Sequence, residues 1–512
     1  MENKNQARLI VDRNFIVDIV DKRLYGTFIE PIGNIIYGNL YNPDHPTADK
    51  NGYRKDVMTL MKELGTTLIR FPGGNYVSGY NWVDGIGPKE KRPVRFDKAW
   101  RQIDTNQMGI DEYVDYNKLL GVENMLAVNL GTGTPEEAAN EVEYCNMKEG
   151  TYWSDLRKKY GHPEPHNIKL WCLGNEMDGF WQIEQKTPED YGKKAREAAK
   201  LMKMVDPEIE LVVCGSCTNE KGMETYPEWD RMVLDYCYDY VDYISLHRYY
   251  SYDPDVYMAF DNPFTIEDLP AIAGDLNDYL DTVLAAADFI KGKKRSNKKL
   301  HISFDEWGVQ TSIKVQPKGL NWQPGPSTKR GARVTNVVDA VLFGSLLITF
   351  LNRCDRVKIA CQSIVIGSMI AASPDGGAYR QSTFYPFKQV ATYGHGMVLK
   401  QNLDSPLLET ANFGQQKSVQ SAVVYNEEEG IVTVFAVNLD LRNSVDLSCK
   451  FLDFAPLKLV EHLRIWDEQP LAGNTFDQQN RIVPHRVEVN QNQNTATLLP
   501  LSWNVLRFQI EK

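Results

Sequence analysis

Two glutamates in this chain stand where a pair of carboxylates can do chemistry. Glu176 ends the apolar stretch of residues 168–176, and Glu306 lies near the end of another, residues 300–307. Paired carboxyl groups suit glycoside hydrolysis, because one protonates the leaving oxygen while the other, ionised, attacks the anomeric carbon. A separation of about 5 Å would give double displacement with retention of configuration. A lone glutamate at a strand end is more often a salt-bridge partner, so the hypothesis rests on the pair and its neighbours.

Polar residues that can support such a pair follow other apolar stretches of the sequence. Asn175 precedes Glu176 and can hydrogen-bond a ring hydroxyl next to the reacting carbon. Arg70 and Tyr249 can hold Glu306 ionised, since positive charge and hydrogen bonds to an anion lower its pKa. The ends of the same set of stretches also supply Glu30, Asn75, His247 and Trp307. A structural, hydrogen-bonded role for His247 is as reasonable as contact with a sugar.

Short apolar runs alternate with helical patterns and must position these residues. The strand-like runs are residues 25–30, 66–72, 123–131, 168–176, 209–216, 241–249, 300–307 and 356–365. Amphipathic helical patterns occupy residues 53–64, 109–120, 135–145, 188–205, 275–290 and 334–351. Eight such units predict an α/β fold, a (β/α)8 TIM barrel, in which catalytic groups lie at the C-terminal ends of the strands. A doubly wound open sheet is the alternative, but no GxGxxG follows the first strand.

The pattern changes near residue 386, after which short mixed apolar and polar runs are separated by Asn, Asp and Gly turns. This pattern predicts a C-terminal antiparallel β-sandwich. We therefore expect three parts: an N-terminal strand within residues 1–17 that joins the sandwich, a catalytic barrel over residues 18–385, and the sandwich domain over residues 386–512.

Composition limits the partners. The net charge of −11 argues against nucleic acid and against an anionic membrane surface, because both need a basic face. The first residues contain no apolar signal segment, and the eight cysteines are scattered, which favours a reducing cytoplasmic location. No zinc, phosphate-loop or nucleophile-elbow motif is present.

Five motifs, in this order, resemble glycoside hydrolase family 51, the α-L-arabinofuranosidases. They are GTFIEPIG (26–33), RFPGGNYVSGYNW (70–82), WCLGNEMDG (171–179), SLHRYY (245–250) and DEW (305–307). The resemblance implies a retaining exo-acting arabinofuranosidase with a carbohydrate substrate, no metal and no cofactor, and often an intracellular homohexamer. It also implies roles for single residues: Glu176 as acid/base, Glu306 as nucleophile, Glu30, Asn75 and Asn175 on the furanose hydroxyls, Tyr249 near the nucleophile, and Arg70, His247 and Trp307 in support.

The sequence departs from the family pattern beside the expected pocket. Gly308 and Gly367 replace larger residues, and Ile364 stands where the family has a glutamine that reaches the sugar, unless Gln362 takes that place through a shift. These departures keep open a different glycoside, such as a β-D-galactofuranoside, a β-xyloside or a β-glucan. A sugar-binding protein without catalysis is the alternative from another class. Aromatic residues Phe180, Trp181 and Trp322 are candidates for the aglycone side, or for core and interface positions.

Overall fold

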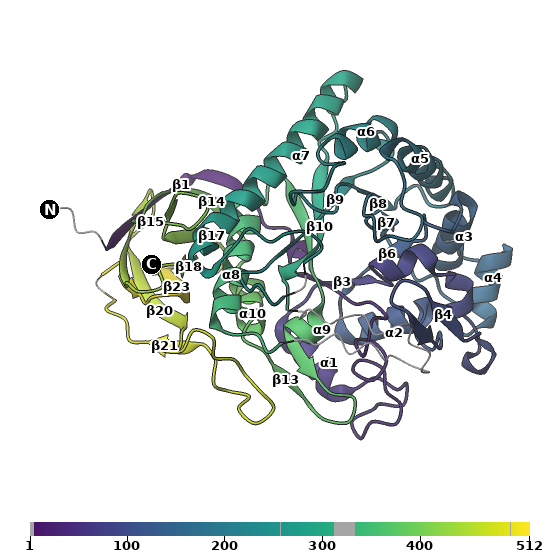
Figure 1. Ribbon diagram of the computed structural model, residues 1–512, viewed down its shortest axis with the longest axis horizontal. Helices are drawn as coiled ribbons and strands as arrows, with labels where there is room; N and C mark the ends of the chain where they lie inside the picture. The colour runs from purple at the N-terminus through teal and green to yellow at the C-terminus, as the bar shows by residue number, and fades with distance from the viewer. Residues whose placement is uncertain (1–4, 257, 312–332, 492, 512) are drawn as a thin grey trace.

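The computed structural model describes residues 5–256, 258–311, 333–491 and 493–511. Eight parallel strands close into a barrel whose neighbours follow chain order, with the last strand pairing with the first (Figure 1). The predicted (β/α)8 barrel is confirmed. In order, the strands are β2 (Gly26–Phe28), β3 (Leu68–Phe71), β6 (Glu123–Val128), β7 (Leu170–Leu173), β8 (Glu210–Cys214), β9 (Tyr243–Tyr250), β10 (His301–Val309) and β11 (Val357–Gln362).

Helices surround this barrel, and two of them begin where the sequence places a threonine N-cap followed by proline. Thr134 accepts a hydrogen bond from the backbone of Glu137 at the start of α3, and Thr187 does the same for Asp190 at the start of α5. Proline follows each cap, where its missing N–H costs nothing. The outer helices are α1 (Lys55–Leu64), α2 (Ile110–Leu120), α3 (Pro135–Asn146), α4 (Tyr152–Lys159), α5 (Pro188–Val205), α6 (Glu228–Cys237), α7 (Ile272–Lys294) and α8 (Val337–Asn352).

A nine-stranded sheet forms the C-terminal β-rich domain, as predicted. Its neighbours are antiparallel except β1 and β19, which are parallel. The N-terminal strand β1 therefore lies among strands from the end of the chain, visible as the purple strand beside the green and yellow ones (Figure 1). In sheet order the strands are β21 (His485–Val487), β20 (Leu457–Ile465), β23 (Ser502–Ile510), β18 (Ile431–Asn438), β17 (Val419–Asn426), β14 (Met397–Asp404), β1 (Gln6–Ile19), β19 (Val445–Leu452) and β22 (Thr495–Leu498).

Helix α8 connects the two parts, because every residue from Val337 to Leu351 is buried. It packs against β10 on the barrel side and against β17, β18 and β23 on the sheet side. A helix that is apolar all round is stable only when both faces are covered. We propose the division expected from the sequence with one adjustment: α10 (Phe384–Tyr393) crosses residue 385, so the barrel domain ends after this helix. Within the described ranges, no helix is long and apolar enough to cross a membrane.

Candidate active site

Glu176 and Glu306 meet at the C-terminal mouth of the barrel. Glu306 lies on β10 and pairs in register with His247 on β9, so both side chains come from neighbouring strand ends. Glu176 follows β7 and has a φ of 44°, a left-handed conformation that is rare outside glycine. Such strain persists only where the surrounding structure enforces it, and it concentrates at functional sites.

The two carboxylates are close enough for a retaining displacement. An oxygen of Glu176 and one of Glu306 lie within 4.8 Å of each other, and both side chains are buried. Inverting enzymes hold their carboxyls roughly 6.5–9.5 Å apart to admit a water, whereas retaining enzymes hold them about 5 Å apart. The separation therefore fits direct attack by one carboxylate on the sugar.

Glu306 is held by a cation and a phenol. Arg70 Nη1 donates to its Oε1 at 2.8 Å, and the Tyr249 hydroxyl donates to its Oε2 at 2.8 Å. The Tyr249 oxygen also lies 2.6 Å from Ser363 Oγ, which can donate to it in turn. On balance the pKa of Glu306 is raised: burial is the largest cause and the charge of Glu176 adds to it, whereas the charges of His247 and Arg70 and the hydrogen bond from Tyr249 act in the opposite direction. Arg70 and Tyr249 thus favour the ionised form that a nucleophile needs.

Glu176 is oriented by two ring N–H groups. Trp181 Nε1 donates to its Oε2 at 2.6 Å, and His247 Nδ1 lies 2.8 Å from its Oε1. Trp181 lies in the loop that follows Glu176, so the loop that carries the carboxyl also fixes its rotamer.

His247 lies among three carboxylates. In addition to the contact with Glu176, its Nε2 is 3.2 Å from Asp305 Oδ1 and its Nδ1 is 3.9 Å from Glu306 Oε2. Burial lowers the pKa of His247, but the charges of Glu306 and Glu176 and the hydrogen bond to Asp305 outweigh it and raise this pKa to about 10. The ring is therefore a cation at neutral pH. His247 thus contacts Glu176 and Asp305 and lies near Glu306, an arrangement that fits a positioning group between the carboxylates.

Replacing His247 with glutamine should move the acidic limb of the kcat/KM profile upwards by about one to three pH units. The imidazolium lowers the pKa of Glu306, so its loss raises that pKa, and activity falls earlier as the pH decreases. The profile is measured on a nitrophenyl arabinofuranoside. His301→Gln, at the opposite end of β10, is the matched control and should leave the limb in place. An unchanged limb in the His247 variant would contradict this role.

Glu30 reaches the same cavity from the end of β2, with a partner that the sequence did not indicate. Its Oε1 accepts hydrogen bonds from the Tyr76 backbone N–H at 2.8 Å and from Trp100 Nε1 at 2.9 Å. Burial and the charge of Glu306 raise the pKa of Glu30 to about 8, although these two hydrogen bonds act in the opposite direction. At neutral pH the carboxyl is mostly protonated, so it can donate a hydrogen bond as well as accept one.

Trp100→Phe should lower kcat/KM by about 3- to 10-fold, mainly through KM, because one hydrogen bond of about 1 kcal/mol that orients Glu30 is lost. Steady-state kinetics separate the two parameters. Trp153→Phe, a half-buried tryptophan that packs on Trp82 and Tyr152, serves as the control. A similar fall of kcat/KM in both variants, arising from kcat rather than from KM, would show a general packing effect instead.

Asn175 accepts a hydrogen bond from Arg70 through its amide oxygen, and its amide nitrogen remains available as a donor. Arg70 Nη2 donates to Asn175 Oδ1 at 2.7 Å. Among the described residues the Asn175 amide nitrogen is buried and has no hydrogen-bond partner. A buried donor of this kind is costly unless a ligand or water accepts from it. The free N–H agrees with the expected contact to a hydroxyl beside the reacting carbon, although Asn175 itself is not among the residues that line the cavity beside it.

A cavity of about 860 Å³ opens above these residues. Of the predicted substrate contacts, Glu30, Asn75, Tyr249, Glu176 and Glu306 line it. Trp181 also lines it and lies against Phe260, whereas Phe180 is 63% exposed. Trp322 lies outside the described residues. Contacts that the sequence analysis did not name include Cys217, Thr218, Arg333 and Tyr379; none of them follows a recognisable motif.

Five of the predicted site residues do not line the cavity: Arg70, Asn175 and His247, described above, and Gln362 and Trp307. The Gln362 amide nitrogen lies within hydrogen-bond distance of the Ser363 carbonyl, at 2.9 Å, and of Ser368 Oγ, at 2.7 Å. Trp307 is buried and packs on Phe343 and Phe350 of α8. Neither lines the cavity, so contact between Gln362 and a sugar stays a prediction, and Trp307 contributes by fixing the strand that carries Glu306.

The two glycine departures have different surroundings. A Cβ at Gly308 would lie 3.0 Å from the Ser363 carbonyl oxygen and 3.2 Å from the Gln362 amide nitrogen. Glycine at this position therefore allows close packing against the end of the neighbouring strand and does not enlarge the cavity. Gly367 borders the cavity with a φ of 111°, next to Ile364. Only the second departure changes the wall that a sugar would meet.

Comparison with known proteins agrees with this geometry. Residues 60–263 match the family described as the alpha-L-arabinofuranosidase 1 domain, and residues 305–502 match the alpha-L-arabinofuranosidase C-terminal domain. An intracellular exo-α-(1→5)-L-arabinofuranosidase from Halalkalibacterium halodurans is 44% identical, covering 98% of this chain and 99% of that protein. An exo-α-(1→6)-L-arabinofuranosidase from Bifidobacterium longum is 40% identical, covering 98% and 97%.

Solved structures are similar over the whole chain. A family 51 α-L-arabinofuranosidase from Bifidobacterium longum superposes with a TM-score of 0.92 at 37% identity, covering 99% of this chain and all of that one. An arabinose complex of the Thermotoga maritima α-L-arabinofuranosidase gives a TM-score of 0.84 at 29% identity, covering 98% and 99%. The chain therefore belongs to glycoside hydrolase family 51, the α-L-arabinofuranosidases.

Proposed function

We propose that this enzyme releases terminal α-L-arabinofuranosyl residues from oligosaccharides of hemicellulose or pectin, by double displacement with retention. The observation that carries the proposal is the pair of buried carboxylates within 4.8 Å at the barrel mouth, one of them bonded to Arg70 and Tyr249. The names of the relatives, which specify exo action on arabinofuranosyl linkages, support the choice of sugar.

In the first step Glu306 attacks the anomeric carbon while Glu176 donates a proton to the leaving oxygen. The Arg70 and Tyr249 hydrogen bonds keep the attacking oxygens anionic and oriented, and His247 stabilises the negative charge that the two carboxylates share. In the second step Glu176 removes a proton from a water that cleaves the glycosyl–Glu306 ester. Glu30, Asn75 and Asn175 bind the furanose hydroxyls, with the free Asn175 amide nitrogen as one donor.

Hydrolysis of a panel of nitrophenyl glycosides tests the substrate: α-L-arabinofuranoside, β-D-galactofuranoside, β-D-xyloside and β-D-glucoside. We expect clear preference for the arabinofuranoside, and NMR of the first product formed should show the α-anomer. Preference for a pyranoside, or β-anomer formation, would overturn the proposal. Arabino-oligosaccharides with (1→5) and (1→6) linkages then separate the two activities named for the relatives.

A β-D-galactofuranoside is the second candidate, because Gly367 and Ile364, two departures from the family pattern, border the cavity. This sugar has the ring stereochemistry of an α-L-arabinofuranoside plus one hydroxymethyl carbon, and an apolar, shortened wall would accept the extra carbon. In the same panel, a kcat/KM on the galactofuranoside within tenfold of that on the arabinofuranoside would support it.

We also propose a cytoplasmic enzyme that assembles as a homo-oligomer, in the form of a hexamer. The word intracellular in the names of several relatives supports the location. Exposed apolar side chains of β1, including Phe15 and Ile19, provide surface for contact between copies. Light scattering after size exclusion should give six times the mass of one chain, and a monomer would contradict the assembly.

A further inference from the structure

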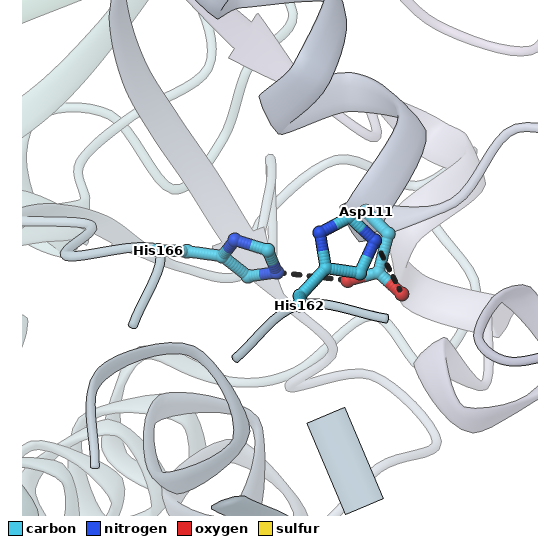
Figure 2. A group of neighbouring side chains, drawn as sticks. All are labelled: Asp111, His162 and His166. Atoms are coloured by element: carbon cyan, nitrogen blue, oxygen red, sulfur yellow. Dashed lines mark hydrogen bonds and ion pairs between the residues drawn. The ribbon is translucent and has the colours of Figure 1, made fainter. Parts of the chain in front are cut away.

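A second cluster of potential ligands lies away from the catalytic cavity. Asp111 is the second residue of α2, and His162 and His166 lie in the segment between α4 and β7. Figure 2 shows both imidazole rings turned toward the Asp111 carboxylate. His166 Nε2 is 2.8 Å from Asp111 Oδ1, and His162 Nε2 is 3.8 Å from Oδ2. One potential ligand atom from each of the three residues lies within 4.8 Å of the other two.

We propose that Asp111, His162 and His166 form a structural binding site for a divalent transition metal, with Zn²⁺ as the preferred ion. Zinc binds imidazole nitrogen and carboxylate oxygen at about 2.0–2.2 Å in a tetrahedron, so neighbouring ligand atoms lie roughly 3.3 Å apart. The separations of 2.8 and 3.8 Å lie on either side of this value, and the ligand nitrogens of the two histidines lie within 4.8 Å of each other, so rotation of the side chains would bring all three ligands onto one ion. Two nitrogens and one oxygen suit zinc better than calcium or magnesium, which prefer oxygen.

The backbone around the cluster is fixed by hydrogen bonds. The Arg157 guanidinium donates to the His162 carbonyl at 3.2 Å and to the carbonyls of Tyr144 and Met147 at the end of α3. The His166 backbone N–H donates to the Cys145 carbonyl at 2.7 Å. Both histidines are therefore held against α3 before any ion binds, which lowers the entropy lost on binding.

Supporting groups complete the site. The Tyr144 hydroxyl donates to Asp111 Oδ2 at 2.8 Å, as outer partners of ligating carboxylates do. The side chain of His162 is 20% exposed, so solvent reaches the cluster from this side.

An ion here would tie the start of α2 to the segment that leads into β7, without taking part in catalysis. The other described group with ligand potential, Glu176 with His247 and Glu306, is the catalytic centre itself, so the experiment must separate the two. Enzyme purified without a histidine tag and stripped with EDTA is titrated with Zn²⁺ by calorimetry. Cobalt is added in parallel, because tetrahedral Co²⁺ bound to nitrogen absorbs in the visible range.

We expect one Zn²⁺ per chain, a higher thermal midpoint with Zn²⁺, and unchanged activity. His162→Gln should weaken binding by more than the roughly 10- to 100-fold that loss of an outer partner costs, and should remove the Co²⁺ absorption. This variant changes a partly exposed residue and should fold; Asp111→Asn is a second test. His485→Gln, an exposed histidine on β21, is the control. Absence of binding to the wild-type enzyme overturns the proposal, as does binding that survives His162→Gln and inhibits hydrolysis, which would place the ion at Glu176 and Glu306.

Discussion

Glu306→Ala should lower kcat by about 10⁴-fold or more, since a covalent nucleophile is removed and water alone must attack. The loss should be similar for good and poor leaving groups, because formation of the glycosyl–enzyme ester precedes everything else. Steady-state kinetics on nitrophenyl and oligosaccharide substrates measure it. Removal of the buried carboxylate deletes one hydrogen bond of Arg70 and one of Tyr249, so the thermal midpoint is recorded to confirm that the variant is folded.

Adding azide to the Glu306→Ala variant tests the role of Glu306 through the configuration of the product. In the cavity left by the carboxylate, azide can attack the anomeric carbon directly and yield a glycosyl azide of inverted configuration. Restored turnover with that product would assign Glu306 as the nucleophile. Retained binding of arabinose by a folded, inactive variant would also exclude the sugar-binding alternative without catalysis. A variant that keeps more than about a tenth of wild-type kcat would contradict the assignment.

Glu176→Ala should show a loss that depends on the leaving group. For an alkyl leaving group, as in an arabino-oligosaccharide, kcat/KM should fall by about 10²- to 10⁴-fold, because the departing oxygen no longer receives a proton. For a dinitrophenyl leaving group, which departs as a stable anion, kcat/KM should change little. Comparison of the two substrates measures the effect. Glu184→Ala, an exposed glutamate in the same loop, is the control and should match the wild type on both.

The second step of the reaction also distinguishes the role of Glu176 from that of Glu306. Without Glu176 as a base, the glycosyl–enzyme ester accumulates when the leaving group is good, and azide then displaces Glu306 to give a product of retained configuration. A retained azide product from one variant and an inverted product from the other would fix both roles. An equal loss on both substrates would show that Glu176 acts by position alone, through His247 and Trp181.

Local patterns in the sequence were sufficient for the architecture. All eight strand-like runs became the strands of the barrel, because continuous apolar segments between amphipathic helices form parallel strands that are covered on both faces. Helix starts such as Thr134 and Thr187 were predictable because a cap depends only on neighbouring residues. The N-terminal strand was expected to join the C-terminal domain, and it pairs there with β14 and β19.

The sequence by itself therefore determined the barrel, the family and the two glutamates at strand ends, since periodicity, caps and ordered motifs are properties of adjacent residues. Tertiary structure alone decided which distant side chains touch. Trp100 bonds to Glu30 across 70 positions, and His247 comes to lie among three carboxylates that set its charge. It also decided that Gly308 admits a neighbouring strand rather than a sugar, and that two histidines converge on Asp111. These contacts depend on how separate segments pack to within about an ångström, and no local pattern records that distance.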